Sequence, residues 1–156
     1  EMMFVDAYFY IISVRMGKRL EVKREIDDSL LDCDVPILIL QPIIENAVEH
    51  GIGNKQKGII TMRVYKKDEA LILEVENNGA LSEEDKATIE QLLKWAGESE
   101  SEKTKSGQLG MRNVNHRIKI MYGENYGLTV ESCGKRDELT VARLTLPIKK
   151  TNKRLS

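Results

Sequence analysis

An asparagine and a histidine lie one helical turn apart in a mostly apolar stretch, LQPIIENAVEHG (residues 40–51), and both could serve a ligand. Asparagine prefers helix caps and turns, so the place of Asn46 inside a predicted helix needs another reason. Its carboxamide oxygen suits a hard cation such as Mg²⁺, which few protein oxygens hold together with substrate phosphates. His50 shares its flank of the helix. Glu45 and Glu49 form an acidic ridge beside them, for which a solvated helix face is the simpler interpretation.

A second amide, Asn77, stands near the end of the stretch LILEVENNG. Counting by twos from Leu71 places Asn77 on the same side of the predicted strand as the apolar residues before it. A buried amide needs hydrogen-bond partners, and a bound ligand could supply them. Asn78 and Gly79 then form a turn, which in isolation is an ordinary loop.

The stretch SGQLGMRNVNHRI carries a third feature that suits phosphate groups. Gly107 and Gly110 allow the backbone to approach a ligand closely, and Gly110 leads into a predicted helix whose free N–H groups favour anions. Arg112 adds positive charge, and Asn113 lies one turn before Arg117. A glycine pair before a helix is weak evidence alone, but three such features in a fixed order are stronger.

A helix is predicted over residues 1–17, and its apolar residues alternate in spacings of three and four. This spacing is typical of the seam of a paired helix, but it equally suits an amphipathic helix on its own domain. Both interpretations remain open. The residues of the seam are Met2, Val5, Phe9, Ile12 and Met16.

Hydrophobic periodicity predicts the remaining elements, and their irregular order indicates an α+β fold, a two-layer sandwich whose mixed, mostly antiparallel sheet has helices on one face. The helix that begins at Pro36 runs to His50, with a kink or late start at Pro42. It turns Leu40, Ile44, Ala47 and Val48 to the sheet and Asn46 to the opposite flank. Strands are predicted at 19–27, 59–65, 71–77, 127–133 and 138–148, and further helices at 82–95, capped by Ser82, and 111–122, with Met111, Val114, Ile118 and Met121 on one face.

The size and charge of the chain restrict its class. Its 156 residues suit one domain with an appendage, and we divide them into a helix at 1–17, a domain at 18–150 and a polar tail at 151–156. The net charge of −1 indicates no general attraction to nucleic acid or membrane. Isolated Cys33 and Cys133 favour a reducing, cytoplasmic location. The apolar runs are shorter than the roughly 20 residues of a membrane span, and the chain is expected to be part of a longer protein.

The three motifs, taken together, resemble the N, G1 and G2 boxes of GHKL ATPases, and specifically the catalytic domain of YesM/LytS-like sensor histidine kinases. The resemblance covers nearly the whole chain. It implies a Bergerat-type α/β sandwich that binds ATP with Mg²⁺ between the sheet-facing helices and a flexible lid at about 80–108.

The same resemblance implies roles for individual residues. Asn46 matches the Mg²⁺ ligand, and His50 falls on the phosphate side. Asn77 takes the place of the aspartate that accepts a hydrogen bond from the adenine amino group, and Gly79 that of the glycine beneath the base. Glu45 is the candidate that assists proton removal or orients the acceptor imidazole. The lid meets the phosphates at Gly107, Gly110, Met111, Arg112 and Asn113.

The implied activity is transfer of the γ-phosphoryl group of ATP to a histidine on a dimerisation helix, and then to a response regulator. Residues 1–17 resemble the second helix of the dimerisation hairpin, and the segment that carries the phosphoacceptor histidine is absent. Neither His50 nor His116 is placed to replace it. The resemblance further implies a homodimeric, membrane-anchored full-length protein, of which this part lies in the cytoplasm without touching the membrane.

Three departures from the family pattern support an alternative, a degenerate domain that acts in interaction or dimerisation. Asn77 replaces the aspartate, which could weaken nucleotide binding about tenfold through loss of a charge-assisted hydrogen bond. Leu81 and Gln108 replace glycines of the second and third motifs. A hydrolytic ATPase of the gyrase or chaperone kind is disfavoured, because Pro42 occupies the place of their water-activating glutamate.

Overall fold

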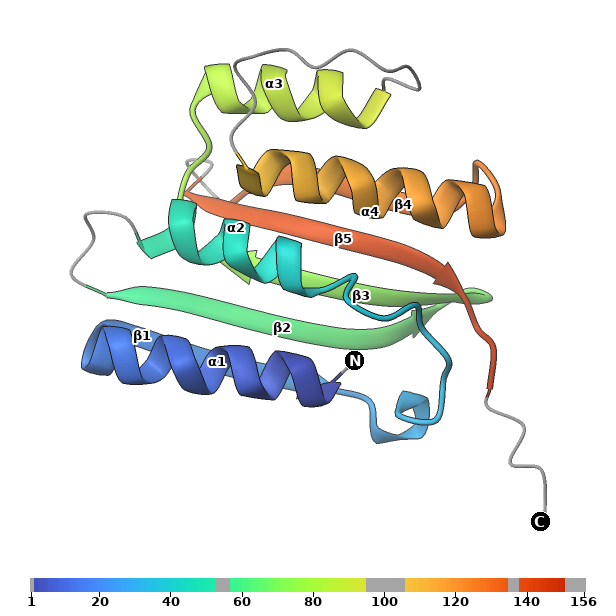
Figure 1. Ribbon diagram of the computed structural model, residues 1–156, viewed down its shortest axis with the longest axis horizontal. Coiled ribbons are helices and arrows are strands. Elements are labelled where there is room, and N and C mark those ends of the chain that lie inside the picture. Colours follow the sequence, from blue (N-terminus) through green and yellow to red (C-terminus); the bar gives the residue numbers. More distant parts are fainter. Residues whose placement is uncertain (1, 53–56, 95–105, 135–137, 151–156) are drawn as a thin grey trace.

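The computed structural model describes residues 2–52, 57–94, 106–134 and 138–150 as a two-layer α+β sandwich (Figure 1). The helices are α1 (Met2–Met16), α2 (Gln41–Ile52), α3 (Glu83–Lys94) and α4 (Ser106–Tyr122). The strands are β1 (Leu20–Ile26), β2 (Gly58–Lys67), β3 (Ala70–Asn77), β4 (Gly127–Cys133) and β5 (Leu139–Pro147). Every predicted strand is therefore confirmed, with shifts of a few residues at the ends.

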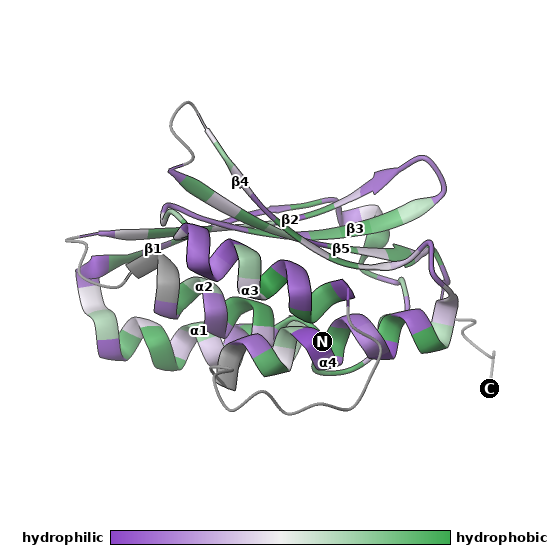
Figure 2. Ribbon diagram, turned by 90° about the horizontal axis from the view of Figure 1, so that it is seen from above, coloured by the Kyte–Doolittle hydropathy of each residue, from purple (hydrophilic) through white to green (hydrophobic). Residues whose placement is uncertain are grey.

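The five strands form one mixed sheet in the order β1-β2-β3-β5-β4. Only β1 and β2 run parallel, and the other three pairs of neighbours are antiparallel. All four helices lie on the same face of this sheet (Figure 2). The predicted fold class is thus confirmed, because apolar residues on one face of the sheet need a helical layer to remove them from water.

Strand β3 has the alternation that the sequence predicts. Leu71, Leu73 and Val75 have exposed fractions of 1, 5 and 1% and belong to the core, and burial of each such side chain contributes roughly 1.5–3 kcal/mol. Asn77 continues their parity and is 3% exposed. The strand therefore delivers an amide to the interior at the point where it ends.

Helix α2 starts late, as the proline in its sequence indicates. Pro42 lies in the first turn, where its missing N–H group would have no partner inside the helix. The carbonyl of Leu40 accepts the N–H groups of Ile43 and Ile44 at 3.1 and 2.9 Å. Just before, Leu38 adopts a left-handed conformation with φ of 58°, so the chain turns before it enters the helix.

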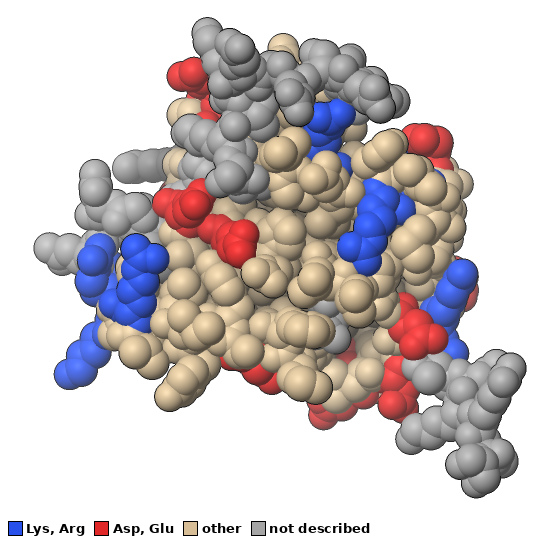
Figure 3. All heavy atoms as spheres, in the orientation of Figure 1, with Lys and Arg blue, Asp and Glu red and all other residues tan. Residues whose placement is uncertain are grey.

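Helix α1 packs on its own domain through the predicted seam. Val5, Phe9 and Ile12 are buried, and the first two join the common core. The opposite side of the helix is also apolar, because Tyr10 and Val14 are 72 and 71% exposed. Figure 3 shows this side of α1 as a mostly uncharged area below the middle of the molecule. One side of α1 thus packs on its own domain, and the exposed apolar side leaves pairing with another helix open.

The face of the sheet without helices carries a ladder of ion pairs across all five strands. Glu74 on β3 is its centre, with a side chain 9% exposed that accepts from Arg143 at 2.9 Å, Tyr65 at 2.9 Å and Arg63 at 3.3 Å. Arg63 on β2 also forms ion pairs with Glu25 on β1 and Glu76 on β3, with nitrogen–oxygen distances of 2.8 and 3.0 Å. Arg143 on β5 forms an ion pair with Glu131 on β4 at 2.9 Å.

Replacement of Glu74 by glutamine should lower the free energy of unfolding by about 1–2 kcal/mol at pH 7, because charge-assisted hydrogen bonds are lost. Burial raises the pKa of Glu74, but its donors, Arg143 foremost, outweigh burial and hold the pKa below its usual value. A lowered folded pKa stabilises the protein above the unfolded pKa of about 4.3, and this contribution is lost as pH falls through the folded pKa.

Urea titrations of the wild type and of Glu74→Gln at pH 7 and pH 3 check this expectation, since the difference between them should shrink at pH 3. Glu69→Gln is the matched control, because the Glu69 side chain is 96% exposed. A difference of equal size at both pH values would contradict the role of the Glu74 charge.

Candidate functional site

Asn46 is buried in the helical layer, with an exposed fraction of 4%. Its Oδ1 atom is removed from solvent and has no hydrogen-bond partner among the described residues. The sequence places Asn46 opposite the sheet-facing stripe of α2 but does not predict its burial; in the structure α2 packs against α4 as well as against the sheet. An unpaired buried acceptor costs about 1–3 kcal/mol, so this atom is suited to a ligand that provides positive charge or a donor.

Asn77 shares a backbone carbonyl with a residue of the neighbouring strand. Its Nδ2 donates to the Gly79 carbonyl at 3.5 Å. The hydroxyl of Thr140 donates to the same carbonyl, and Thr140 pairs with Asn77 across β3 and β5. All three residues are buried. The predicted inward orientation of Asn77 is confirmed.

Asn46 is carried by α2, and Asn77 is the last residue of β3. Helix α2 packs on β2 and β3, and its C-terminal end leads towards the start of β2 (Figure 1). Asn77 pairs with Ile60 near that start, so it lies at the end of the sheet that the second half of α2 covers. The described residues contain no group of three or more His, Cys, Asp or Glu side chains placed to hold a metal.

Helix α4 begins before the glycines that the sequence places ahead of it. It starts at Ser106, so Gly107 and Gly110 lie within the helix. A Cβ atom at Gly110 would lie 2.9 Å from Cβ of Pro42, which means that Gly110 allows α4 to approach α2 closely. The free N–H groups of the helix therefore belong to residues 106–109, and not to 110–113 as expected.

The residues that follow Gly110 point in different directions. Met111 is 1% exposed and belongs to the core, whereas Asn113 is exposed. Arg112 lines a cavity of about 490 Å³ between α3 and α4, together with Lys94 and His116. The structure does not bring Met111, Arg112 and Asn113 together, because consecutive helical residues are rotated by about 100° from one another.

Glu45 faces helix α1, on a different side of α2 from Asn46. It accepts a hydrogen bond from Nε2 of Gln41 at 3.0 Å. Burial raises the pKa of Tyr8 on α1, and the negative charges of Glu45 and Glu49 raise it further. Glu45 is thus directed to the helix whose sequence resembles a dimerisation helix. His50 lies in α2, and its side chain falls outside the described part of the structure.

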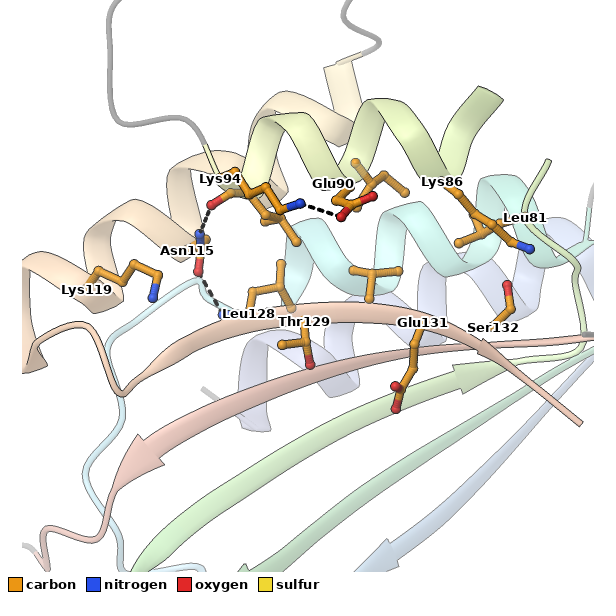
Figure 4. Close-up of a pocket in the computed structure, with 13 residues that line it drawn as sticks. Leu81, Lys86, Glu90, Lys94, Asn115, Lys119, Leu128, Thr129, Glu131 and Ser132 are labelled. Atoms are coloured by element: carbon orange, nitrogen blue, oxygen red, sulfur yellow. Dashed lines mark hydrogen bonds and ion pairs between the residues drawn. The ribbon is translucent and has the colours of Figure 1, made fainter. Parts of the chain in front are cut away.

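Leu81 and Gln108, which depart from the family pattern, are 7 and 2% exposed. Leu81 also lines a cavity of about 450 Å³ between α3 and β4 (Figure 4). Neither Asn46 nor Asn77 lines this cavity or the one beside Arg112. In the described conformation Asn46 and Asn77 are 4 and 3% exposed.

Thr140 and Asn115 are among the buried polar residues that sequence reasoning missed. Thr140 could have been found only from the pairing of β5 with β3, which the sequence does not specify. Asn115 is 4% exposed and connects three elements, since Nδ2 donates to the Leu93 carbonyl at 3.2 Å and Oδ1 accepts from the Leu128 N–H at 2.8 Å (Figure 4). Its position four residues after Met111, on the buried face of α4, was an available signal.

Residues 32–150 match the family described as histidine kinase-, DNA gyrase B-, and HSP90-like ATPase, and the chain belongs to this family. Its mixed sheet under one helical layer agrees with this membership. The resemblance to the catalytic domains of LytS-like sensor histidine kinases is confirmed by the similarity of the chain to curated LytS proteins.

Among curated proteins, the chain is similar to sensor protein LytS of Oceanobacillus iheyensis, with 28% identity over 138 residues that cover 86% of this chain and 23% of LytS. Sensor histidine kinase YpdA of Escherichia coli is 32% identical over 125 residues, which cover 80% of this chain and 20% of YpdA. The chain therefore spans less than a quarter of these two relatives.

Solved structures show the same fold at low identity. The catalytic domain of histidine kinase ThkA, in a nucleotide-free form, superimposes with a TM-score of 0.67 at 16% identity and covers 94% of this chain and 90% of its own. The mycobacterial sensor histidine kinase MprB gives a TM-score of 0.62 at 14% identity and covers 96 and 95%. Within the described ranges, no helix has the length and apolar character that a membrane crossing needs.

Proposed function

We propose that this chain is the ATP-binding catalytic domain of a two-component sensor histidine kinase. The full-length protein would transfer the γ-phosphoryl group of ATP to a histidine on its dimerisation helix and then to a response regulator. Membership of the ATPase family supports nucleotide binding, and the sensor kinases among its relatives support the acceptor. We further propose that the full-length protein is a membrane-anchored homodimer.

The observation that carries this proposal is the unpaired Oδ1 of Asn46. A carboxamide oxygen buried without a partner fits a hard cation that takes its other ligands from water and from phosphate oxygens. When bound, Mg²⁺ would neutralise charge on the triphosphate. Asn77 would accept the amino hydrogen of adenine, and Gly79 would lie against the base. These residues bind and orient the nucleotide, which is most of what phosphoryl transfer requires.

Glu45 has a different task in this proposal. In the transfer, a bond forms from the acceptor imidazole nitrogen to the γ-phosphorus while the bond from that phosphorus to the bridging oxygen breaks. Glu45 would orient the imidazole or accept its proton, because it faces α1. We assign the phosphate contacts to His50, Gly107, Gly110, Met111, Arg112 and Asn113, with α4 shifted from its described position for those that diverge.

A degenerate domain with weak or no nucleotide binding is the second candidate. Leu81 and Gln108 favour it, because both are large side chains buried where the family pattern has glycine. A domain in which these side chains permanently block the site would serve in interaction or dimerisation only.

Isothermal titration of the chain with ATP, with Mg²⁺ and with EDTA, separates the two candidates. We expect binding that weakens at least about tenfold when Mg²⁺ is removed, together with a rise in melting temperature at saturating MgATP. Neither heat nor thermal shift at millimolar nucleotide would rule out the kinase domain and favour the degenerate one.

A further inference from the structure

We propose that the nucleotide site accepts 6-oxopurine triphosphates, such as GTP and ITP, as well as ATP. This inference rests on the proposed function and extends its substrate class. It depends on one residue, Asn77, and on the two groups that surround its amide, the Gly79 carbonyl and the Thr140 hydroxyl.

The two kinds of purine present opposite hydrogen-bond patterns. Adenine offers an amino donor beside a ring-nitrogen acceptor, whereas a 6-oxopurine offers a carbonyl acceptor beside an N–H donor. A carboxylate only accepts, so it complements the adenine amino group and repels the carbonyl of a 6-oxopurine. The amide of Asn77 both accepts and donates. A half turn about its terminal bond exchanges Oδ1 with Nδ2, so the side chain can match either base.

The structure restrains this half turn only weakly. Nδ2 of Asn77 lies 3.5 Å from the Gly79 carbonyl oxygen, beyond the usual range of an N–H···O hydrogen bond. The Thr140 hydroxyl already donates to that oxygen, so Gly79 does not depend on Asn77 for a partner. In the described orientation Oδ1 is the atom left for adenine. After the half turn Oδ1 faces the Gly79 oxygen, and this modest repulsion sets a preference for ATP.

Burial makes the choice between amide and carboxylate decisive. Asn77 is 3% exposed and Thr140 is also 3% exposed, so water has little access to correct a mismatch at this position. A carboxylate opposite the oxygen of guanine would leave two desolvated acceptors facing each other, which costs far more than an unused donor. The amide avoids that penalty with both bases.

Titration of the chain with MgATP, MgGTP, MgITP and MgCTP tests the proposal. We expect dissociation constants for GTP and ITP within about tenfold of that for ATP, and clearly weaker binding of CTP, whose base is smaller. In Asn77→Asp the preference for ATP over GTP should increase at least about tenfold. Asn78→Asp is the matched control, since the Asn78 side chain hydrogen-bonds to the backbone of Ile59 and Lys57, and it should leave this ratio unchanged.

The outcomes separate this inference from the proposed function. One outcome is that ATP binds but is displaced by neither GTP nor ITP at concentrations about 100 times the dissociation constant of ATP. The inference is then wrong and the proposed function stands. CTP binding as tight as that of GTP would also overturn it, because Asn77 would then not read the base. Failure of every nucleotide to bind refutes the proposed function itself. If Asn77→Asp does not fold by circular dichroism, the wild-type competition alone decides.

Discussion

Replacement of Asn46 by alanine should remove the Mg²⁺ dependence of nucleotide binding, so that ATP binds equally weakly with Mg²⁺ and with EDTA. The loss in the presence of Mg²⁺ should be at least about tenfold, because the buried, unpaired Oδ1 of Asn46 is gone. Calorimetric titration of both proteins measures this difference directly.

The same variant should keep its stability, which distinguishes a ligand-binding asparagine from a structural one. Loss of an unpaired acceptor removes a desolvation penalty, so the free energy of unfolding should fall by no more than about 1 kcal/mol. Glu49→Ala, an exposed change on the same helix, should alter neither property. A clearly destabilised Asn46→Ala protein that still responds to Mg²⁺ would show that Asn46 is structural.

Replacement of Asn115 by alanine should have the opposite effect, a large loss of stability. The change leaves the Leu93 carbonyl and the Leu128 N–H without the partners that connect α3, α4 and β4. Two such losses cost about 3 kcal/mol, which for a domain of this size lowers the melting temperature by roughly 10 °C. Differential scanning calorimetry provides the measurement.

Asn113→Ala is the comparison for Asn115, because Asn113 lies two residues earlier on α4 and is exposed. Its effect on the free energy of unfolding should stay within about 0.5 kcal/mol. Equal melting temperatures of the two variants would mean that the hydrogen bonds of Asn115 do not join the three elements.

The local sequence pattern predicted where helices and strands lie, but it did not predict which of them are in contact. The alternation that ends at Asn77 depends only on strand geometry, and Pro42 limits the start of α2 by its own chemistry, so both features could be read from neighbouring residues. The early start of α4 could not be read in this way. Gly110 suggested a turn before the helix, whereas in the structure it lies within α4 and allows close approach to Pro42 of α2. Tertiary packing decides such positions, and local propensity is only a weak guide to them.

The candidate site shows the same division. The sequence indicated Asn46 as unusual but not that it is buried, because burial of that side of α2 depends on how the helices pack together. It also placed Met121 with the buried face of α4, yet Met121 is 52% exposed and Tyr122 packs against the core at that end of the helix. Thr140 becomes visible only when the order of strands is known.

The ladder of ion pairs has a consequence for how copies of this protein meet. It ends in a carboxylate at each margin of the sheet, Glu25 on β1 and Glu131 on β4. An additional strand that joined either margin would have to take that charge out of water, which opposes aggregation through backbone pairing. The exposed apolar side of α1 has no such row of charges among its described residues. Two copies should therefore associate through their helices, with the charged face of each sheet still in contact with water.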